Sequence, residues 1–340
     1  MRRRAGALLS AALLLAVVGL VALQVAGPWE DPSPAGEPRP RPWPARHEEP
    51  RVALGVTTTA LARNAYRPWR PADLSEVNAF EQLARRHAGI VMWFADWAHN
   101  EHFDAAQARA VAERGSTPEV TWEPWDALRG FDQPRYRLAR IVAGDHDAYI
   151  ERWAREIAAY GGPVRLRLAQ EMNGRWYPWA ELVNGNRPGD FVRAWRHVRA
   201  IFDAAGATNV TWVWAPVAGA ARPGLFPGAN QVDVIGVSGF NGGSILFRRE
   251  WRSFAEAFGP TLDYVHALAP GKPIELAEVA STETGGSKAA WIDGMFDEIE
   301  RRPYIRAIIW FNLRKETDWR IESSAGARRA FAEGISRASR

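Results

Sequence analysis

Short apolar runs alternate with longer amphipathic segments from residue 51 to the end of the chain. The short runs are rich in β-branched and aromatic residues, which is typical of strands. Eight strands are predicted, at residues 52–58, 90–97, 118–125, 164–170, 210–215, 232–238, 273–280 and 305–312. The longer segments have apolar residues three and four apart and predict helices at residues 74–87, 105–114, 148–160, 191–205, 253–268, 288–301 and 325–335.

The regular order of strand and helix predicts the fold class. Eight βα alternations favour an α/β protein whose single catalytic domain, residues 51–340, is a (β/α)8 TIM barrel. Residues 217–231, between the fifth and sixth strands, are too rich in Gly and Pro for a full helix. A doubly wound open sheet is the alternative, although no glycine-rich phosphate-binding loop follows the first strand.

The first 50 residues differ in character from the rest of the chain. Residues 1–4 form a basic start and residues 5–27 carry no charge, which predicts an uncleaved anchor or a cleaved signal peptide over residues 1–27. Residues 28–50 are rich in Pro, Glu and Arg, so we expect a Pro-rich linker there. In both cases the barrel is predicted outside the cytoplasm, secreted or held at the membrane by a single N-terminal span.

Composition narrows the functional classes. The chain has no Cys, which excludes disulfides, thiolate metal sites and a Cys nucleophile. Its formal net charge is only +4 and its Arg residues are scattered, so we expect no nucleic-acid partner. The 17 Trp residues exceed what a core needs, and flat indole rings suit the apolar faces of sugars. We therefore expect a polysaccharide as the partner, bound by a monomer.

Two glutamates are the candidates for chemistry at the carboxyl ends of the strands, where barrel enzymes hold their active sites. Glu171 ends the fourth strand and Glu278 ends the seventh, on roughly opposite sides of an eight-stranded barrel. Hydrolysis of a glycosidic bond needs two carboxyl groups, one protonated and one ionised. We predict Glu171 as the acid/base and Glu278 as the nucleophile, with Arg167 keeping Glu278 ionised. Glu275 is expected on the opposite face of its strand and is the weaker candidate.

Aromatic and polar residues gather at the same predicted strand ends, as expected for a sugar cleft. The residues that we predict to bind substrate are Arg167, Gln170, Asn173, Trp176, Trp179, Trp122, Glu123, Trp214, Phe240 and Trp310. His99 and His102, near Glu101 and Asp104, could be proposed as metal ligands, but their spacing on a loop favours solvated side chains. Neither a metal nor a cofactor is expected.

Several motifs together resemble glycoside hydrolase family 26 over about residues 52–331. They are Arg167 with Gln170-Glu171-Met172-Asn173-Gly174, Trp176 and Trp179; Trp212-Val213-Trp214-Ala215-Pro216; Lys272-Pro273 leading to Glu278; Lys288 with Trp291; and Trp310-Phe311-Asn312 followed by Asp318-Trp319-Arg320. The resemblance implies a retaining barrel enzyme with Glu171 as acid/base and Glu278 as nucleophile. It also implies an endo-acting hydrolase of β-mannan or of a β-1,3/1,4-glucan.

The chain departs from the family pattern at positions around the predicted cleft. Gln170 and Glu123 stand where the family, or its mannanases, tend to have His, and Val217 stands where Asn is common. Ser238 and Phe240 replace an Asp and a Tyr. These departures concern mannan specificity more than hydrolysis. The alternatives are a catalytically weak barrel that binds a cell-surface exopolysaccharide, and a glycan-trimming partner of a polysaccharide synthase.

Overall fold

The computed structural model describes residues 50–64, 73–219, 222, 224–246 and 250–340. The predicted anchor or signal peptide, residues 1–27, lies outside this part of the chain, as does the predicted linker apart from Pro50. Among the helices that the structure describes, none has the length and apolar character needed to cross a bilayer.

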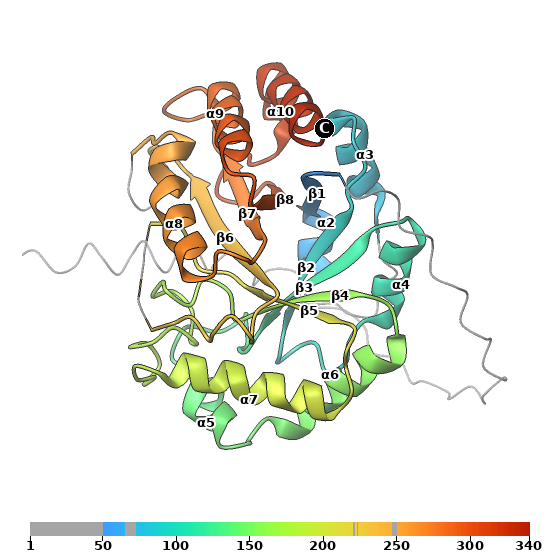
Figure 1. Cartoon of the computed structure of the whole chain (residues 1–340), viewed down its shortest axis with the longest axis vertical. Coiled ribbons are helices and arrows are strands. Elements are labelled where there is room, and N and C mark those ends of the chain that lie inside the picture. The colour runs from blue at the N-terminus through green and yellow to red at the C-terminus, as the bar shows by residue number, and fades with distance from the viewer. Residues whose placement is uncertain (1–49, 65–72, 220–221, 223, 247–249) are drawn as a thin grey trace, which may run out of the picture.

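Eight parallel strands close into a barrel in sequence order (Figure 1). They are β1 (Ala53–Thr58), β2 (Ile90–Asp96), β3 (Thr117–Glu123), β4 (Val164–Leu168), β5 (Val210–Trp214), β6 (Val234–Asn241), β7 (Ile274–Ser281) and β8 (Ile305–Asn312). Strand β8 pairs with β1 over six residue pairs, from Ala53 with Ala307 to Thr58 with Asn312. This closure confirms the predicted TIM barrel and excludes the doubly wound open sheet.

The helices surround the strands (Figure 1). They are α2 (Thr59–Asn64), α3 (Ser75–Ala84), α4 (Ala105–Glu113), α5 (Leu138–Val142), α6 (Asp147–Tyr160), α7 (Asp190–Ala204), α8 (Phe254–Leu268), α9 (Lys288–Arg301) and α10 (Ala325–Ala338), with short 3-10 turns at Pro134–Tyr136 and Ile321–Ser323. All seven predicted helices are confirmed. Helices α2 and α5 were not predicted, because five or six residues are too few to show a helical period.

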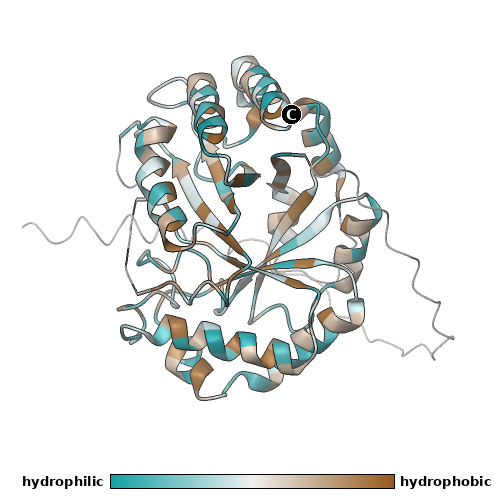
Figure 2. Cartoon of the chain, viewed as in Figure 1, coloured by the Kyte–Doolittle hydropathy of each residue, from teal (hydrophilic) through white to brown (hydrophobic). Residues whose placement is uncertain are grey.

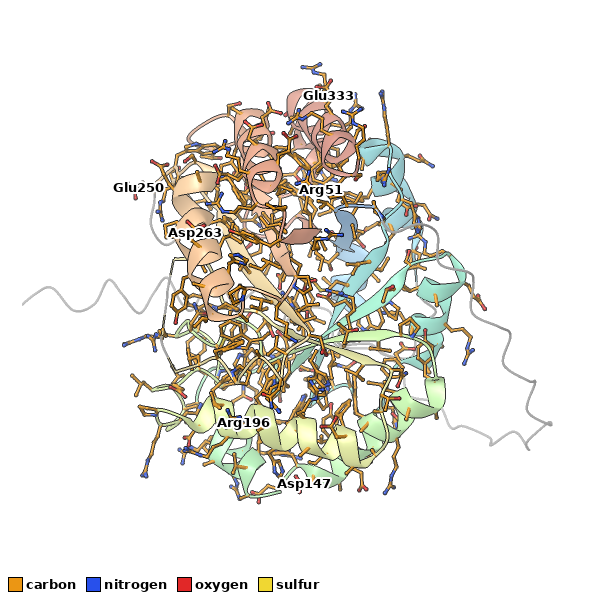
Figure 3. All side chains as sticks on the ribbon, in the orientation of Figure 1. Arg51, Asp147, Arg196, Glu250, Asp263 and Glu333 are labelled. Atoms are coloured by element: carbon orange, nitrogen blue, oxygen red, sulfur yellow. The ribbon has the colours of Figure 1, made fainter. Side chains whose placement is uncertain are left out.

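The main core lies between the strands and this helical layer. Helix α7 illustrates the helical spacing of apolar residues, because Trp195, Val198 and Phe202 are buried along one of its faces. Phe202 packs on Trp212 of β5 with 5.0 Å between ring centroids, and Trp195 packs on the same indole at 5.9 Å. The outer helices carry hydrophobic and hydrophilic positions side by side (Figure 2), and charged residues such as Asp263 and Glu333 lie at the periphery (Figure 3). This packing fixes the strands that hold the site.

The inside of the barrel is polar at two successive levels. At the lower level Arg165 of β4 lies between Glu119 of β3, 2.8 Å away, and Glu275 of β7. Arg167 is two residues further along β4, so its side chain points inward one level nearer the mouth. A buried guanidinium requires such partners, because desolvation of an unpaired charge is costly. The two arginines thus share one face of the strand.

A change of register in β7 corrects one expectation about its glutamates. Strand pairing shifts between Gly236 and Ser238 on the β6 side and between Leu276 and Val279 on the β8 side. An extra residue of this kind breaks the simple alternation of side-chain directions. Glu275 and Glu278 therefore both point into the barrel, each towards an arginine of β4. The prediction that Glu275 faces the other side of the strand was wrong. Glu275 and Glu278 differ in their level inside the barrel, since Glu275 lies at the lower level with Arg165 and Glu278 lies nearer the mouth with Arg167.

Candidate active site

Glu171 is held at the mouth of the barrel by an unusual stretch of backbone after β4. Ala169 and Glu171 both have positive φ, 47° and 54°, although neither is glycine. Left-handed backbone costs an L-residue roughly 1–2 kcal/mol. The turn is held in place because the Glu171 amide donates to the Ala215 carbonyl oxygen at 2.7 Å. The result is a carboxyl group that is buried to 8% exposure at the carboxyl end of the strand.

Trp176 lies beside this carboxyl group. Its Nε1 donates to Glu171 Oε2 at 2.7 Å, while 43% of the residue is exposed. The Trp176 indole therefore orients the Glu171 carboxyl group through its N–H. The rest of the ring leaves apolar surface exposed, on which a sugar could stack. Trp179 lies behind it, fully buried: it stacks on Tyr177 with 4.2 Å between centroids and donates to the Gln170 carbonyl oxygen at 2.7 Å. Trp179 supports the loop instead of facing the cleft.

Glu278 is paired with Arg167, which is completely buried. The same guanidinium donates to Thr121 Oγ1 from Nε at 2.9 Å and from Nη2 at 2.6 Å, and to Ser238 Oγ from Nη1 at 3.3 Å. These contacts from β3 and β6 fix the guanidinium, and the guanidinium in turn fixes the Glu278 carboxyl group. Glu278 thus has a buried cationic partner.

The environments of the two glutamates differ in the way that acid and base roles require. Burial, followed by the nearby charge of Glu278, raises the pKa of Glu171 to about 7. The hydrogen bond from Trp176 and the charge of Arg167 act in the opposite direction. At neutral pH the site can therefore hold one protonated carboxyl group beside one carboxylate that is paired with arginine.

The raised pKa of Glu171 predicts an alkaline limit to activity. An acid with a raised pKa keeps its proton up to that pKa, so the proton-donating form is complete at lower pH and is lost as the pH rises through about 7. We expect kcat/KM on a polysaccharide to begin falling near that pH. In Trp176→Phe, which loses the bond that lowers this pKa, the fall should move to higher pH. Activity that is constant through neutral and alkaline pH would contradict the role of Glu171.

Removing Arg167 is expected to destabilise the fold. Arg167→Met leaves the Glu278 carboxyl group without its cation, and breaking a buried ion pair in this way costs about 3–5 kcal/mol of unfolding free energy. Urea unfolding at neutral pH measures the loss. The control is Arg155→Ala, since Arg155 is exposed and pairs with Glu151 one turn away on α6, where little change is expected. Equal stability of the two variants would rule out this structural role for Arg167.

Glu123 is a third buried acid at the carboxyl ends of the strands. It ends β3 with 3% exposure, and its Oε1 accepts from Gln170 Nε2 at 2.6 Å. Trp125 Nε1 donates to Oε2 at 3.3 Å. Burial raises the pKa of Glu123 to about 8, and the charges of Asp96 and Glu278 also act in this direction. Gln170 thus joins the β3 end to the loop that carries Glu171.

Besides Trp179, three more of the predicted substrate-binding tryptophans are buried. Trp122 is fully buried and packs on Trp153 of α6 with 5.0 Å between centroids. Trp214 is 2% exposed against Phe226, and Trp310 is fully buried against Phe331 of α10. Successive side chains of a strand point to opposite faces, and each of these tryptophans follows or precedes a residue that points into the barrel. The tryptophans therefore point outwards, towards the helices. These residues belong to the core, and the predicted ring of exposed indoles reduces to Trp176.

The two remaining predicted contact residues lie near the mouth. Phe240 of β6 is partly exposed and packs against Phe311 and Trp319, with centroid distances of 5.0 and 5.4 Å. Asn173 is buried and exchanges two hydrogen bonds of 2.8 Å with the backbone of Val217. Asn173 therefore ties together the loops after β4 and β5, and Phe240 packs on one aromatic ring of β8 and one from the segment that follows β8.

Sequence reasoning missed several residues of the site. Thr121 binds the Arg167 guanidinium, and Trp125 binds Glu123. Ser238 was noted only as a departure from the family pattern, and its contact with Arg167 was not predicted. Alternation along β3 could have found Thr121, since it lies between the inward-facing Glu119 and Glu123. Trp125 and Tyr177 lie on loops, where no periodicity marks the direction of a side chain.

One cluster near the cleft has the composition of a metal site. Ligand atoms of Asp96, His99 and Asp126 lie within 4.8 Å of one another. Asp96 already accepts from His99 Nδ1 at 2.6 Å and from the Ala127 amide at 2.9 Å, so hydrogen bonding accounts for the arrangement. His102 instead contacts Glu156 at 2.5 Å. His99 thus contacts Asp96, and His102 contacts Glu156. The sequence had suggested Glu101 and Asp104 as the nearby acids instead.

A closed barrel with two buried glutamates, one after β4 and one on β7, is the arrangement expected of a glycoside hydrolase. A model of glycosyl hydrolase family 26 matches residues 93–270, a range that includes Glu171 and ends before Glu278. The chain belongs to this family.

Similar proteins include an endoglucanase, mannan endo-1,4-beta-mannosidases and a beta-1,3-xylanase. Endoglucanase H of Acetivibrio thermocellus is 37% identical over 295 residues, which cover 83% of this chain and 31% of that protein. A mannan endo-1,4-beta-mannosidase of Bacillus subtilis is 25% identical over 138 residues, covering 39% of this chain and 34% of that protein. The chain thus spans about a third of the length of both this endoglucanase and this mannosidase.

Solved structures of mannanases share the fold. A family 26 β-mannanase from Bacteroides ovatus superposes with a TM-score of 0.59 at 16% identity, covering 86% of this chain and 89% of that one. A Bacillus subtilis mannanase gives 0.58 at 17% identity, covering 84% and 86%. At this identity the likeness shows the barrel and leaves the substrate open.

Proposed function

We propose that the protein is a retaining endo-β-glucanase that cleaves a β-1,4 or mixed β-1,3/1,4-linked glucan by double displacement. The observation that carries this proposal is the asymmetric pair of glutamates: Glu171 is buried with a raised pKa, and Glu278 is held by a buried arginine. Hydrolysis by acid and nucleophile needs this difference in protonation state.

The proposed reaction has two steps. Glu171 donates its proton to the glycosidic oxygen while the Glu278 carboxylate attacks the anomeric carbon, so the leaving chain departs and a glycosyl-enzyme forms. Glu171, now ionised, then takes a proton from water, and the water oxygen attacks the same carbon and displaces Glu278. Both groups return to their starting states, and inversion at each step gives overall retention.

The choice of glucan over mannan comes from the relatives and from the cleft. Endoglucanase H is similar over most of this chain, whereas the mannosidase match covers 39% of it at lower identity. Glu123 stands where mannanases of the family tend to have His, and it accepts a hydrogen bond from Gln170, which precedes the acid. Trp176 supplies an exposed apolar ring for stacking.

We also propose that the enzyme acts outside the cytoplasm. Its substrate would be a polymer that does not cross a membrane, and residues 5–27 are uncharged after a basic start. Fractionation of cells expressing the full chain tests this: the protein should be found in the medium or at the outer face of the membrane. Recovery in the cytosol alone would contradict the proposal.

A substrate screen tests the proposed function. The fragment from residue 51 should release reducing ends from lichenan and mixed-linkage β-glucan much faster than from mannan, and more slowly or not at all from curdlan. Short products of several lengths should appear early, since endo cleavage cuts within the chain. Faster hydrolysis of mannan would reverse the substrate assignment. Binding of a glucan without turnover at any pH would instead favour a carbohydrate-binding barrel.

A further inference from the structure

Glu123 is an acid at the cleft that the proposed double displacement does not use. It lies at the carboxyl end of β3, next in order to the strand that carries Arg167 and leads to Glu171. The residue is 3% exposed, so little water reaches its carboxyl group. Both oxygens take their hydrogen bonds from neutral N–H groups, Oε1 from Gln170 at 2.6 Å and Oε2 from Trp125 at 3.3 Å.

The charged groups that face Glu123 are themselves acidic. Asp96 at the end of β2 and Glu278 on β7 both act on it, and Tyr177 on the loop after β4 feels its charge. The buried cation of the neighbourhood, Arg167, is committed to Glu278. A negative Glu123 would therefore be a further buried anion without a cation of its own, which is an unfavourable arrangement in a low-dielectric site.

We propose that Glu123 works as a neutral carboxylic acid that donates its proton to a hydroxyl oxygen of the sugar bound beside the cleaved linkage. The inference rests on the proposed function for the presence of a sugar, and goes beyond it in assigning the charge state and direction of this hydrogen bond. The proton belongs on Oε2. An acid hydroxyl there still accepts from Trp125 and has its own proton free for the ligand, while Oε1 remains the acceptor for Gln170.

Burial supports this picture, because it raises the pKa of Glu123 to about 8. The acid form is then present at neutral pH and is lost as the pH rises through that value. Two acids, Glu171 and Glu123, would then lose protons in succession on the alkaline side. Above the second of them, log(kcat/KM) should fall with a slope of −2.

A neutral donor gives Glu123 a role in specificity. A buried donor that meets no acceptor costs binding, so a sugar whose hydroxyl points elsewhere binds less well. Glucose and mannose differ in the direction of one hydroxyl group. A neutral Glu123 would favour the sugar whose hydroxyl group lies within reach of its proton. It would do so without adding a negative charge beside Glu171 and Glu278.

The matched variants are Glu123→Gln and Glu123→Asp. Glutamine keeps the size of the side chain and cannot ionise, whereas aspartate keeps the carboxyl group but is one methylene shorter. In the infrared spectrum near pH 7, the wild type should show a protonated carboxyl band that Glu123→Gln lacks. Glu171→Gln and Glu275→Gln are the controls that identify the bands of two further acids whose pKa is raised by burial. In Glu123→Gln, the alkaline slope of log(kcat/KM) on β-glucan should decrease from −2 to −1, because the amide does not titrate.

Two results would overturn the inference. One is an unchanged infrared spectrum in Glu123→Gln near pH 7, which would mean that Glu123 is a carboxylate. The other is a loss of more than about a thousandfold in kcat/KM below pH 7 with an unchanged melting temperature, which would mean that a negative charge is required. The infrared test does not depend on turnover. A wild-type chain that shows the band but hydrolyses no glycan would therefore refute the proposed function and leave the charge state of Glu123 supported.

Discussion

Replacing Glu278 with alanine is expected to lower kcat on β-glucan by at least about 10⁴-fold, as removal of a covalent nucleophile does in other enzymes. Without its carboxylate, nothing attacks the anomeric carbon from the face where Glu278 lies. The space left beside Arg167 can admit azide, a small anion that the guanidinium would attract. With an activated aryl β-glucoside, azide should restore turnover and give the α-glycosyl azide, because attack from that face inverts the configuration once.

The matched control for Glu278→Ala is Glu275→Gln on the same strand. Glu275 also points into the barrel, but it pairs with Arg165 at the lower level. Its replacement should change the melting temperature and leave kcat within roughly tenfold of the wild type. A Glu278→Ala enzyme that keeps more than a tenth of the wild-type kcat, with its fold intact, would show that another group is the nucleophile.

Replacing Glu171 with alanine should produce a different kinetic pattern. On β-glucan, whose leaving group needs a proton, kcat/KM should fall by about 10²–10⁴-fold. On a dinitrophenyl β-glucoside, whose leaving group departs unaided, the first step should change little and the glycosyl-enzyme should accumulate as an initial burst. Azide should now give the β-glycosyl azide, since it replaces the water that Glu171 would have activated in the second step.

The control for this variant is Glu181→Gln in the same loop. Glu181 accepts from the Gly189 and Phe191 amides near the start of α7, so its change should affect loop stability and leave the leaving-group dependence as in the wild type. The alkaline decline near pH 7 should also disappear in Glu171→Ala. Equal losses on both kinds of substrate would show that Glu171 is not the proton donor.

The sequence was sufficient to predict the barrel because two periodicities alternate along it. Strands and helices recur from residue 51, and all eight strands and seven helices are present. The arginine partner of Glu278 was also predictable, since Arg165 and Arg167 are two residues apart on one strand and an inward charge needs a counter-charge.

The directions of individual side chains were harder to predict. Trp122, Trp214 and Trp310 come at strand ends, but one step along a strand reverses the direction of a side chain, so all three lie in the core. The register shift in β7 reversed the expectation for Glu275, because an irregularity of pairing has no signature in hydrophobic pattern.

Contacts between the loops could not be predicted from the sequence. The bond between Gln170 and Glu123 joins residues 47 positions apart, and the bonds between Asn173 and Val217 span 44. Such pairs depend on how the turns after β3, β4 and β5 leave the barrel. The positive φ angles of Ala169 and Glu171 illustrate the difficulty, since neither residue type favours that backbone conformation.

The configuration of the first product tests most directly whether Glu171 and Glu278 act as acid/base and nucleophile on one linkage. Proton NMR of a β-glucan oligosaccharide, recorded during the first moments of hydrolysis before the anomers equilibrate, reports the new reducing end. Two successive displacements at the anomeric carbon predict that the β anomer appears first. Initial appearance of the α anomer would mean a single displacement by water, and Glu278 could then not be the nucleophile.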